Sequence, residues 1–282
     1  LKLFSHEKIF SEYIFKDLIK IRNKMKKIIS LSLVAVSTIF LTTGCINHQE
    51  NAEHTKSHEA HWGYEGKYSP SHWGEMKEQF AMCSKGKEQS PINIIPTEDV
   101  NLKALGFNYH TDSTDIINNG HTVQVNIASG STVNINGVDY ELKQFHFHTP
   151  SENNINGKRF PLEAHFVHAA KDGSLAVVAV MFEEGKENPI IGKIWSKFPL
   201  KENEKVSINL SSNDIKSIMP LNKDYYKFIG SLTTPPCSEN VKWNVFKTSM
   251  TISKEQVKQF FDIFEHPNNR PIQDINGRVI SE

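Results

Sequence analysis

The sequence predicts a mainly β protein with a few peripheral helices, and two observations support this fold class. After residue 60, most of the chain consists of short apolar or alternating runs separated by Gly, Asn, Asp and Pro, a pattern typical of strands joined by turns. Helix signals, in contrast, occur at only two places. The chain has 282 residues, of which 38% are hydrophobic, so it can bury a sizeable core in one large domain.

The first 60 residues are expected to lie outside this fold. Residues 1–24 precede a first methionine and are interpreted as upstream sequence, with a rare start codon as the alternative. Residues 25–45 have a basic start, an apolar run and then Cys45, which is the layout of an export signal. Residues 46–60 are polar and lack periodicity, which indicates a flexible linker. We therefore expect export to the periplasm or cell surface, with lipid attachment at Cys45 and simple cleavage nearby as open alternatives.

The expected strands share short length, apolar or alternating character and flanking turn residues. In chain order they are Thr122–Ile127, Thr132–Ile135, Tyr140–His148, Pro161–Ala169, Leu175–Phe182, Val206–Leu210 and Val241–Phe246. One helix is expected over Ile190–Lys197, after Asn188-Pro189. A second is expected over Val257–Phe264, preceded by the capping box of Ser253 and Gln256.

Charge and cysteine content narrow the class of protein further. The formal net charge is zero for the whole chain and mildly acidic once residues 1–45 are removed, so no nucleic-acid partner is expected. Two cysteines, Cys83 and Cys237, remain after the export signal. In an exported protein such a pair indicates a disulfide, and two unrelated buried thiols are the alternative.

The stretch QFHFHTPSE, residues 144–152, predicts a metal site. On a strand, His146 and His148 share one face while the two phenylalanines share the other. A turn-rich segment follows, and the next strand carries His165, so a hairpin would bring the three imidazoles together. Three neutral imidazoles with one open position form the arrangement of a catalytic zinc site. Gln144 and Glu163 are placed to orient His146 and His165, respectively.

One alternative uses the same histidines differently. His146-x-His148-x-x-x-Glu152 also fits the first motif of cupins, β-barrels in which this glutamate is itself a metal ligand. The cupin pattern places a glycine about seven residues after the glutamate, whereas Gly157 comes five residues after Glu152. A second cupin motif has no counterpart downstream, so the cupin alternative is the weaker one.

Seven separated motifs together resemble the α-class carbonic anhydrases of the exported bacterial type, in the family's order from His61 almost to the C-terminus. The resemblance implies that residues 61–282 form one domain with a large twisted, mostly antiparallel central sheet and a conical active-site cleft. It also implies a zinc lyase that reversibly hydrates CO2 to bicarbonate and a proton, with attack by zinc-bound hydroxide. The motifs are HWGY (61–64), QSPINI (89–94), NNGH (118–121), QFHFHTPSE (144–152), LEAHFVH (162–168), GSLTTPPC (230–237) and NRP (269–271).

The resemblance assigns a role to each matching residue. His146, His148 and His165 would be zinc ligands, Thr233 would orient the hydroxide and donate to Glu152, and His121 would shuttle protons. Under this assignment Glu152 is a partner of Thr233 and does not bind the metal. An apolar substrate pocket would be lined by Val167, Val177, Leu232, Thr234, Val241 and Trp243, and the proton network by Tyr64, Asn119 and Gln124.

Three further expectations come from the family. Cys83 and Cys237 match the disulfide of exported members, and bacterial members are often homodimers. Asn153 occupies the position after the Ser-Glu pair where the family often has a histidine. This departure puts the fine adjustment of the site in doubt, but not its activity. A non-catalytic relative is the remaining alternative; such a protein is expected to lack at least one zinc histidine, whereas all three are present here.

Overall fold

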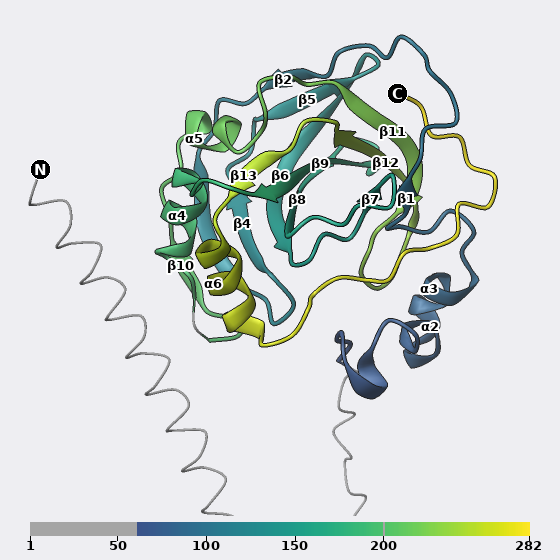
Figure 1. Cartoon of the computed structure of the whole chain (residues 1–282), viewed down its shortest axis with the longest axis horizontal. Helices are drawn as coiled ribbons and strands as arrows, with labels where there is room; N and C mark the ends of the chain where they lie inside the picture. The colour runs from purple at the N-terminus through teal and green to yellow at the C-terminus, as the bar shows by residue number, and fades with distance from the viewer. Residues whose placement is uncertain (1–60, 200) are drawn as a thin grey trace, which may run out of the picture. The chain divides into compact units, whose positions relative to one another are not determined.

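The computed structural model describes residues 61–199 and 201–282, so the expected upstream segment, export signal and linker, with Cys45, lie outside the described residues. Strands dominate this part of the chain, and the helices lie at its periphery (Figure 1). The mainly β class is therefore confirmed. Within these residues no helix is long and apolar enough to cross a bilayer.

One large sheet of 11 strands forms the body of the fold, with the path β10-β3-β4-β6-β8-β9-β12-β11. β13 adds to it beside β9, and β5 and β2 extend it from β6. A separate two-stranded sheet joins β1 (Asn93–Ile94) and β7 (Asn154–Ile155). The large sheet comprises β2 (Gly106–Asn108), β3 (Ser113–Asn118), β4 (Val123–Ile127), β5 (Thr132–Ile135), β6 (Val138–His148), β8 (Leu162–Ala169), β9 (Leu175–Glu184), β10 (Lys205–Ser207), β11 (Tyr225–Ser231), β12 (Glu239–Phe246) and β13 (Met250–Ile252).

Most neighbouring strands in the large sheet run antiparallel, as expected, but β12 and β13 both pair with β9 in parallel. The sheet is therefore mixed at its centre. β9 reads LAVVAVMFEE, and its residues from Ala176 to Phe182 are buried. A strand covered on both faces is expected to be a continuous apolar run, which explains why β9 lacks alternation.

The two faces of the sheet carry separate cores. Phe145, Phe147 and Phe166 belong to the main cluster, which α4 (Pro189–Trp195) and α6 (Lys254–Phe264) cover from the periphery. α4 and α6 lie side by side at one margin of the sheet (Figure 1). On the opposite face, a second cluster includes residues of β9, β11 and β12. The histidines of β6 face this second side because side chains alternate along a strand.

Both expected helices are present, and their caps explain where they begin. The Asn188 side chain accepts hydrogen bonds from the first backbone N–H groups of α4. At α6, Ser253 and Gln256 form the predicted reciprocal capping box. α6 then buries Phe260, whose ring lies 5.3 Å from that of Trp195 in α4.

The structure differs from the expected elements in several places. The strand expected at Val206–Leu210 is only the three residues of β10, because beyond Ser207 the Ser113 hydroxyl replaces part of the backbone pairing with β3. This hydroxyl donates to the Ile208 carbonyl and accepts from the Leu210 N–H, and both Ile208 and Leu210 are buried in the main core. β11 was not expected, although it has alternating burial. Other elements without a sequence prediction are β1, β2, β3, β7, β13, α2 (Trp73–Met76), α3 (Met82–Lys85), α5 (Ser212–Ser217) and the 3-10 turns Gly66–Tyr68 and Glu78–Phe80.

Candidate metal centre

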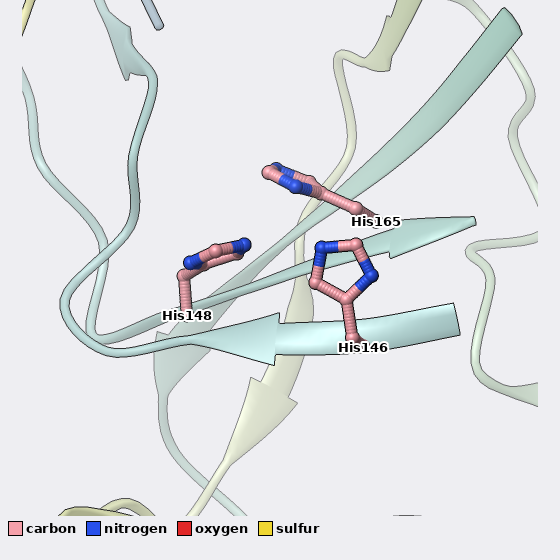
Figure 2. Close-up of side chains that lie close together, drawn as sticks. All are labelled: His146, His148 and His165. Carbon is pink, nitrogen blue, oxygen red and sulfur yellow. The ribbon is translucent and has the colours of Figure 1, made fainter. Parts of the chain in front are cut away.

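Three histidines from adjacent strands converge on one point. β6 pairs antiparallel with β8, and this register places His146 directly opposite His165. His148 lies two residues further along β6, on the same face. Figure 2 shows the three imidazoles turned toward one another above the two strands. One ligand nitrogen from each ring can be chosen so that all three lie within 4.8 Å of one another.

The far nitrogens of two rings are held by the residues that the sequence indicated. Nδ1 of His146 donates to Oε1 of Gln144 over 2.8 Å. Nε2 of His165 lies 2.9 Å from Oε1 of Glu163. The ring nitrogen that faces an acceptor oxygen carries the proton of the neutral ring, and the other nitrogen is then the ligand. His146 therefore presents Nε2 and His165 presents Nδ1.

The partner of His148 was not predicted. Its Nδ1 donates to the backbone carbonyl of Asn268 over 2.6 Å, so His148 also presents Nε2. The Asn268 side chain fixes this contact, because it accepts from the Thr149 N–H and donates to the Phe147 carbonyl. The only sequence signal for this partner was the neighbouring NRP motif at 269–271.

The residues present fit a zinc ion. Nε2 of His148 is buried and has no hydrogen-bond partner among the described residues, which is costly unless the atom binds something else. Burial is the main cause that lowers the pKa of all three imidazoles, that of His148 to about 4, so the rings are neutral. Neutral imidazoles with an open position match catalytic zinc. Within the described part of the chain, this is the one cluster of three or more His, Cys, Asp or Glu with metal-binding spacing.

Asn153 anchors the carboxylate that orients His165. Oε2 of Glu163 accepts from the backbone N–H groups of Glu152 and Asn153, each over 2.8 Å, and Oε1 accepts from Nδ2 of Asn153. Burial raises the pKa of Glu163 to about 7, and the Asn153 hydrogen bonds oppose this rise. A metal cation held through His165 would further favour the carboxylate form.

Glu152 lies beside the histidines but outside their ligand set. Its Oε1 accepts from the Arg270 backbone N–H over 2.8 Å, while its buried Oε2 lies 3.5 Å from Nε2 of His148. Burial raises the pKa of Glu152 to about 8; hydrogen bonds from the Arg270 N–H and the Thr233 hydroxyl oppose the rise. The structure thus brings together Thr233 and Glu152, the two residues expected to act as a pair.

A cavity of about 110 Å³ opens onto this site. Its lining includes the predicted shuttle His121, all three residues of the predicted proton network, and two of the three converging histidines, His146 and His148. The Asn119 side chain accepts from the backbone N–H groups of His121 and Thr122 and so fixes the turn that presents His121. The lining residues are Trp62, Tyr64, Asn119, His121, Thr122, Gln124, Gln144, His146, His148 and Thr234.

Two cavity side chains are held in defined orientations. The His121 ring stacks on Trp62 with a centroid distance of 3.5 Å. Burial, followed by the nearby His61 and His266, lowers the pKa of His121 to about 4. Nε2 of Gln124 donates to Oδ1 of Asn126 over 2.7 Å, which leaves the Gln124 carbonyl oxygen as the acceptor end of the amide.

The residues expected to form an apolar pocket lie together but do not line this cavity. Val177, Val241 and Trp243 are almost fully buried in the second core cluster, and Val167 and Leu232 pack against it. The Trp243 ring lies 4.9 Å from that of His165. Of the six pocket residues, Thr234 alone is among the cavity-lining residues. A larger hollow of about 470 Å³, between residues 99–104 and 223–225, contains none of the predicted site residues.

The disulfide between Cys83 and Cys237 is present. It ties the Thr233 loop to α3, whose Cys83 carbonyl accepts from the guanidinium of Arg270 over 2.8 Å. Arg270 is fully buried, and its guanidinium also donates to Gln89 and Ser90. The sequence indicated Arg270 only as part of the NRP motif. In the structure, the Arg270 backbone N–H contacts Glu152 and its guanidinium contacts the Cys83 carbonyl, so Arg270 connects Glu152 to the disulfide.

Comparison with known proteins agrees with the site. A family model described as Eukaryotic-type carbonic anhydrase matches residues 68–282. A carbonic anhydrase from Pectobacterium atrosepticum is 46% identical over 79% of this chain and 91% of its own length, and one from Neisseria gonorrhoeae is 47% identical over 79% and 88%. The structure of an α-carbonic anhydrase from Thermovibrio ammonificans in complex with sulfanilamide has a TM-score of 0.76 and 42% identity; the match covers 79% of this chain and 99% of that one. On these matches and on its fold, the chain belongs to the α-class carbonic anhydrase family.

Proposed function

We propose that the protein is a zinc enzyme that catalyses the reversible hydration of CO2 to bicarbonate and a proton. One observation carries the proposal: three imidazoles converge with their ligand nitrogens free and their other nitrogens held by Gln144, Asn268 and Glu163. When bound, zinc would lower the pKa of a water ligand to about 7 and so supply a nucleophile at neutral pH.

The residues beside the histidines would orient the reactants. The Thr233 hydroxyl has one proton, and the buried Oε2 of Glu152, which has no hydrogen-bond partner among the described residues, would accept it. With its own proton directed to Glu152, the Thr233 oxygen can only accept a hydrogen bond from the reacting water. This fixes the direction of the water's lone pair toward CO2. Glu152 keeps its own position because the Arg270 N–H holds Oε1.

Catalysis would also require a proton to leave the site, and the cavity provides the path. Asn119 and Gln124 present fixed polar groups along it, and His121 stands at its wall as the proton-accepting imidazole. We propose that Val167 and Leu232 contribute the apolar side on which CO2 lies. Val177, Val241 and Trp243 would support that side from within the second core cluster.

Stopped-flow CO2 hydration by the purified, zinc-loaded chain tests the proposal. We expect fast turnover, its loss in His146→Ala, and no change in His110→Ala, an exposed histidine outside the cavity. Zinc binding without turnover in the unmodified chain would favour a non-catalytic relative instead. Glu152→Gln distinguishes the cupin alternative, because zinc occupancy is retained if Glu152 is not a ligand.

Export is part of the proposal and has separate support. A structural disulfide forms and persists in oxidising compartments, and Cys83–Cys237 is such a bond. We propose a periplasmic or cell-surface protein, with lipid attachment at Cys45 as one mode of retention. Mass spectrometry of the protein isolated from a bacterial host would distinguish an acylated Cys45 from simple cleavage. Sedimentation would test the homodimer expected from the family.

A further inference from the structure

A second histidine, His266, contacts a residue that lines the cavity, and the proposed mechanism does not use it. The Tyr64 ring lines the cavity, and its neighbours include both His121, at 6.5 Å between centroids, and His266, at 6.2 Å. His61 is a third imidazole here, but it stacks on His121 at 4.9 Å and would extend the same route. The His266 ring contacts the Tyr64 ring directly, and not through the His121 ring.

The chain fixes His266 beside the cavity through its neighbours. It follows α6 directly, and two residues later Asn268 donates to the His121 backbone carbonyl over 3.0 Å. Asn268 also accepts from the Thr149 N–H and receives the His148 hydrogen bond. The segment that holds one metal-binding imidazole thus also holds His266 near the proton path.

The hydrogen bonding of His266 makes it a proton acceptor. Its Nδ1 lies 2.9 Å from the Pro267 carbonyl oxygen, which can only accept, so Nδ1 carries the proton of the neutral ring. Nε2 therefore keeps its lone pair. The ring is partly exposed, so a proton taken up at Nε2 can pass on to buffer or bulk water.

The environment of His121 makes it a poor proton acceptor, so a second acceptor would contribute to proton transfer. A proton acceptor works best when its pKa is close to that of the donor, which is about 7 for zinc-bound water. Burial beside Trp62 instead lowers the pKa of His121 to about 4, and His61 and His266 add to the shift. In this stacked position His121 accepts protons weakly.

We propose that His266 is a second proton-transfer residue, which takes protons out of the cavity in parallel with His121. The inference rests on the proposed function. In each cycle, water in the cavity loses one proton, Nε2 of His266 gains it to form the imidazolium, and the imidazolium returns it to external buffer. The titratable groups that face His266 are Tyr64 and His121, and Glu265 precedes it in the chain.

The test compares zinc-loaded full-length variants at saturating CO2 in low and high concentrations of buffer. Proton transfer limits kcat only when external buffer is scarce, so a proton-transfer residue affects kcat at low buffer and leaves kcat/KM unchanged. We expect His266→Ala to lower kcat at low buffer at least about twofold, and the double variant with His121→Ala to lower it about tenfold or more. High buffer restores kcat in both. His110→Ala, the matched surface control, behaves as the unmodified chain.

Two results would overturn the inference. One is a His266→Ala protein with unchanged kcat at low buffer, together with a double variant equal to His121→Ala alone; the proposed function would then stand without it. The other is a loss of kcat/KM in His266→Ala that high buffer does not restore, which would indicate a structural role. If the unmodified zinc-loaded chain shows no turnover, the proposed function fails, and this inference fails with it.

Discussion

Removing the disulfide is predicted to weaken both the fold and the catalytic loop. Cys83 and Cys237 are 154 residues apart in the chain and both are buried, so the bond closes a large loop of the unfolded state. In the chain-entropy description, closing a loop of this length stabilises the folded state by about 5 kcal/mol. We choose alanine for both positions, because serine would bury an additional hydroxyl group.

The expected loss can be measured as a melting temperature. For a domain of this size, each kcal/mol corresponds to about 2–4 °C, so Cys83→Ala with Cys237→Ala is expected to melt about 10–20 °C lower. Differential scanning calorimetry of the zinc-loaded protein, with the unmodified chain reduced and oxidised as controls, gives the number.

Turnover should fall as well, because the bond braces the Thr233 loop. Without it, the loop keeps the hydrogen bonds of Leu232 to Ser238 and of Cys237 to Thr234, so we expect a reduced kcat, by about tenfold, and not its abolition. Zinc content should be unchanged, since neither cysteine is a ligand or a partner of the three imidazoles. Full turnover together with an unchanged melting temperature in the double variant would refute this reasoning.

Three further predictions address the metal partner, a helix cap and a buried histidine. Glu163→Gln is expected to lower zinc affinity by about 10–100-fold, measured by chelator competition with Glu183→Gln as the surface control, because His165 loses its carboxylate partner. Ser253→Ala removes the capping box of α6 and should reduce the free energy of unfolding by about 1 kcal/mol in urea titrations, without a change in the slope. Burial lowers the pKa of His168 from 6.5 to about 4, so the unfolded chain binds more protons than the folded one, and stability should fall by up to about 3 kcal/mol as pH drops from 6.5 to 4. Replacing His168 with Leu and its hydrogen-bond partner Tyr109 with Phe should reduce this acid sensitivity relative to the unmodified chain; equal pH profiles would contradict the assignment.

The metal hairpin was predictable because its signals are local. The alternation of His and Phe in β6 fixes which face each side chain takes, and the turn after Glu152 brings β8 back alongside. Gln144 and Glu163 stand two residues before the histidines that they orient. Every one of these relations depends only on the two-residue period of a strand and on one turn.

The remaining contacts could not be read from local patterns. The Asn268 carbonyl and the Arg270 N–H reach His148 and Glu152 across 120 and 118 residues of sequence. These are backbone atoms, which every residue has, so residue type gives no indication of their roles. β11 was missed for a similar reason: its place beside β12 depends on tertiary pairing, which overrides the weak local signal.

The distant origin of these two contacts sets the order in which the site can be completed during synthesis. The hairpin of β6 and β8 can form soon after it emerges, with two of its histidines already oriented by nearby side chains. His148 and Glu152 receive their backbone partners only after the last part of the chain, with residues 268 and 270, has been made and has packed against them. A nascent or C-terminally cut chain would therefore carry the metal-binding motif without the means to use it. Catalytic activity would therefore require a chain that has been synthesised at least as far as residue 270 and has folded.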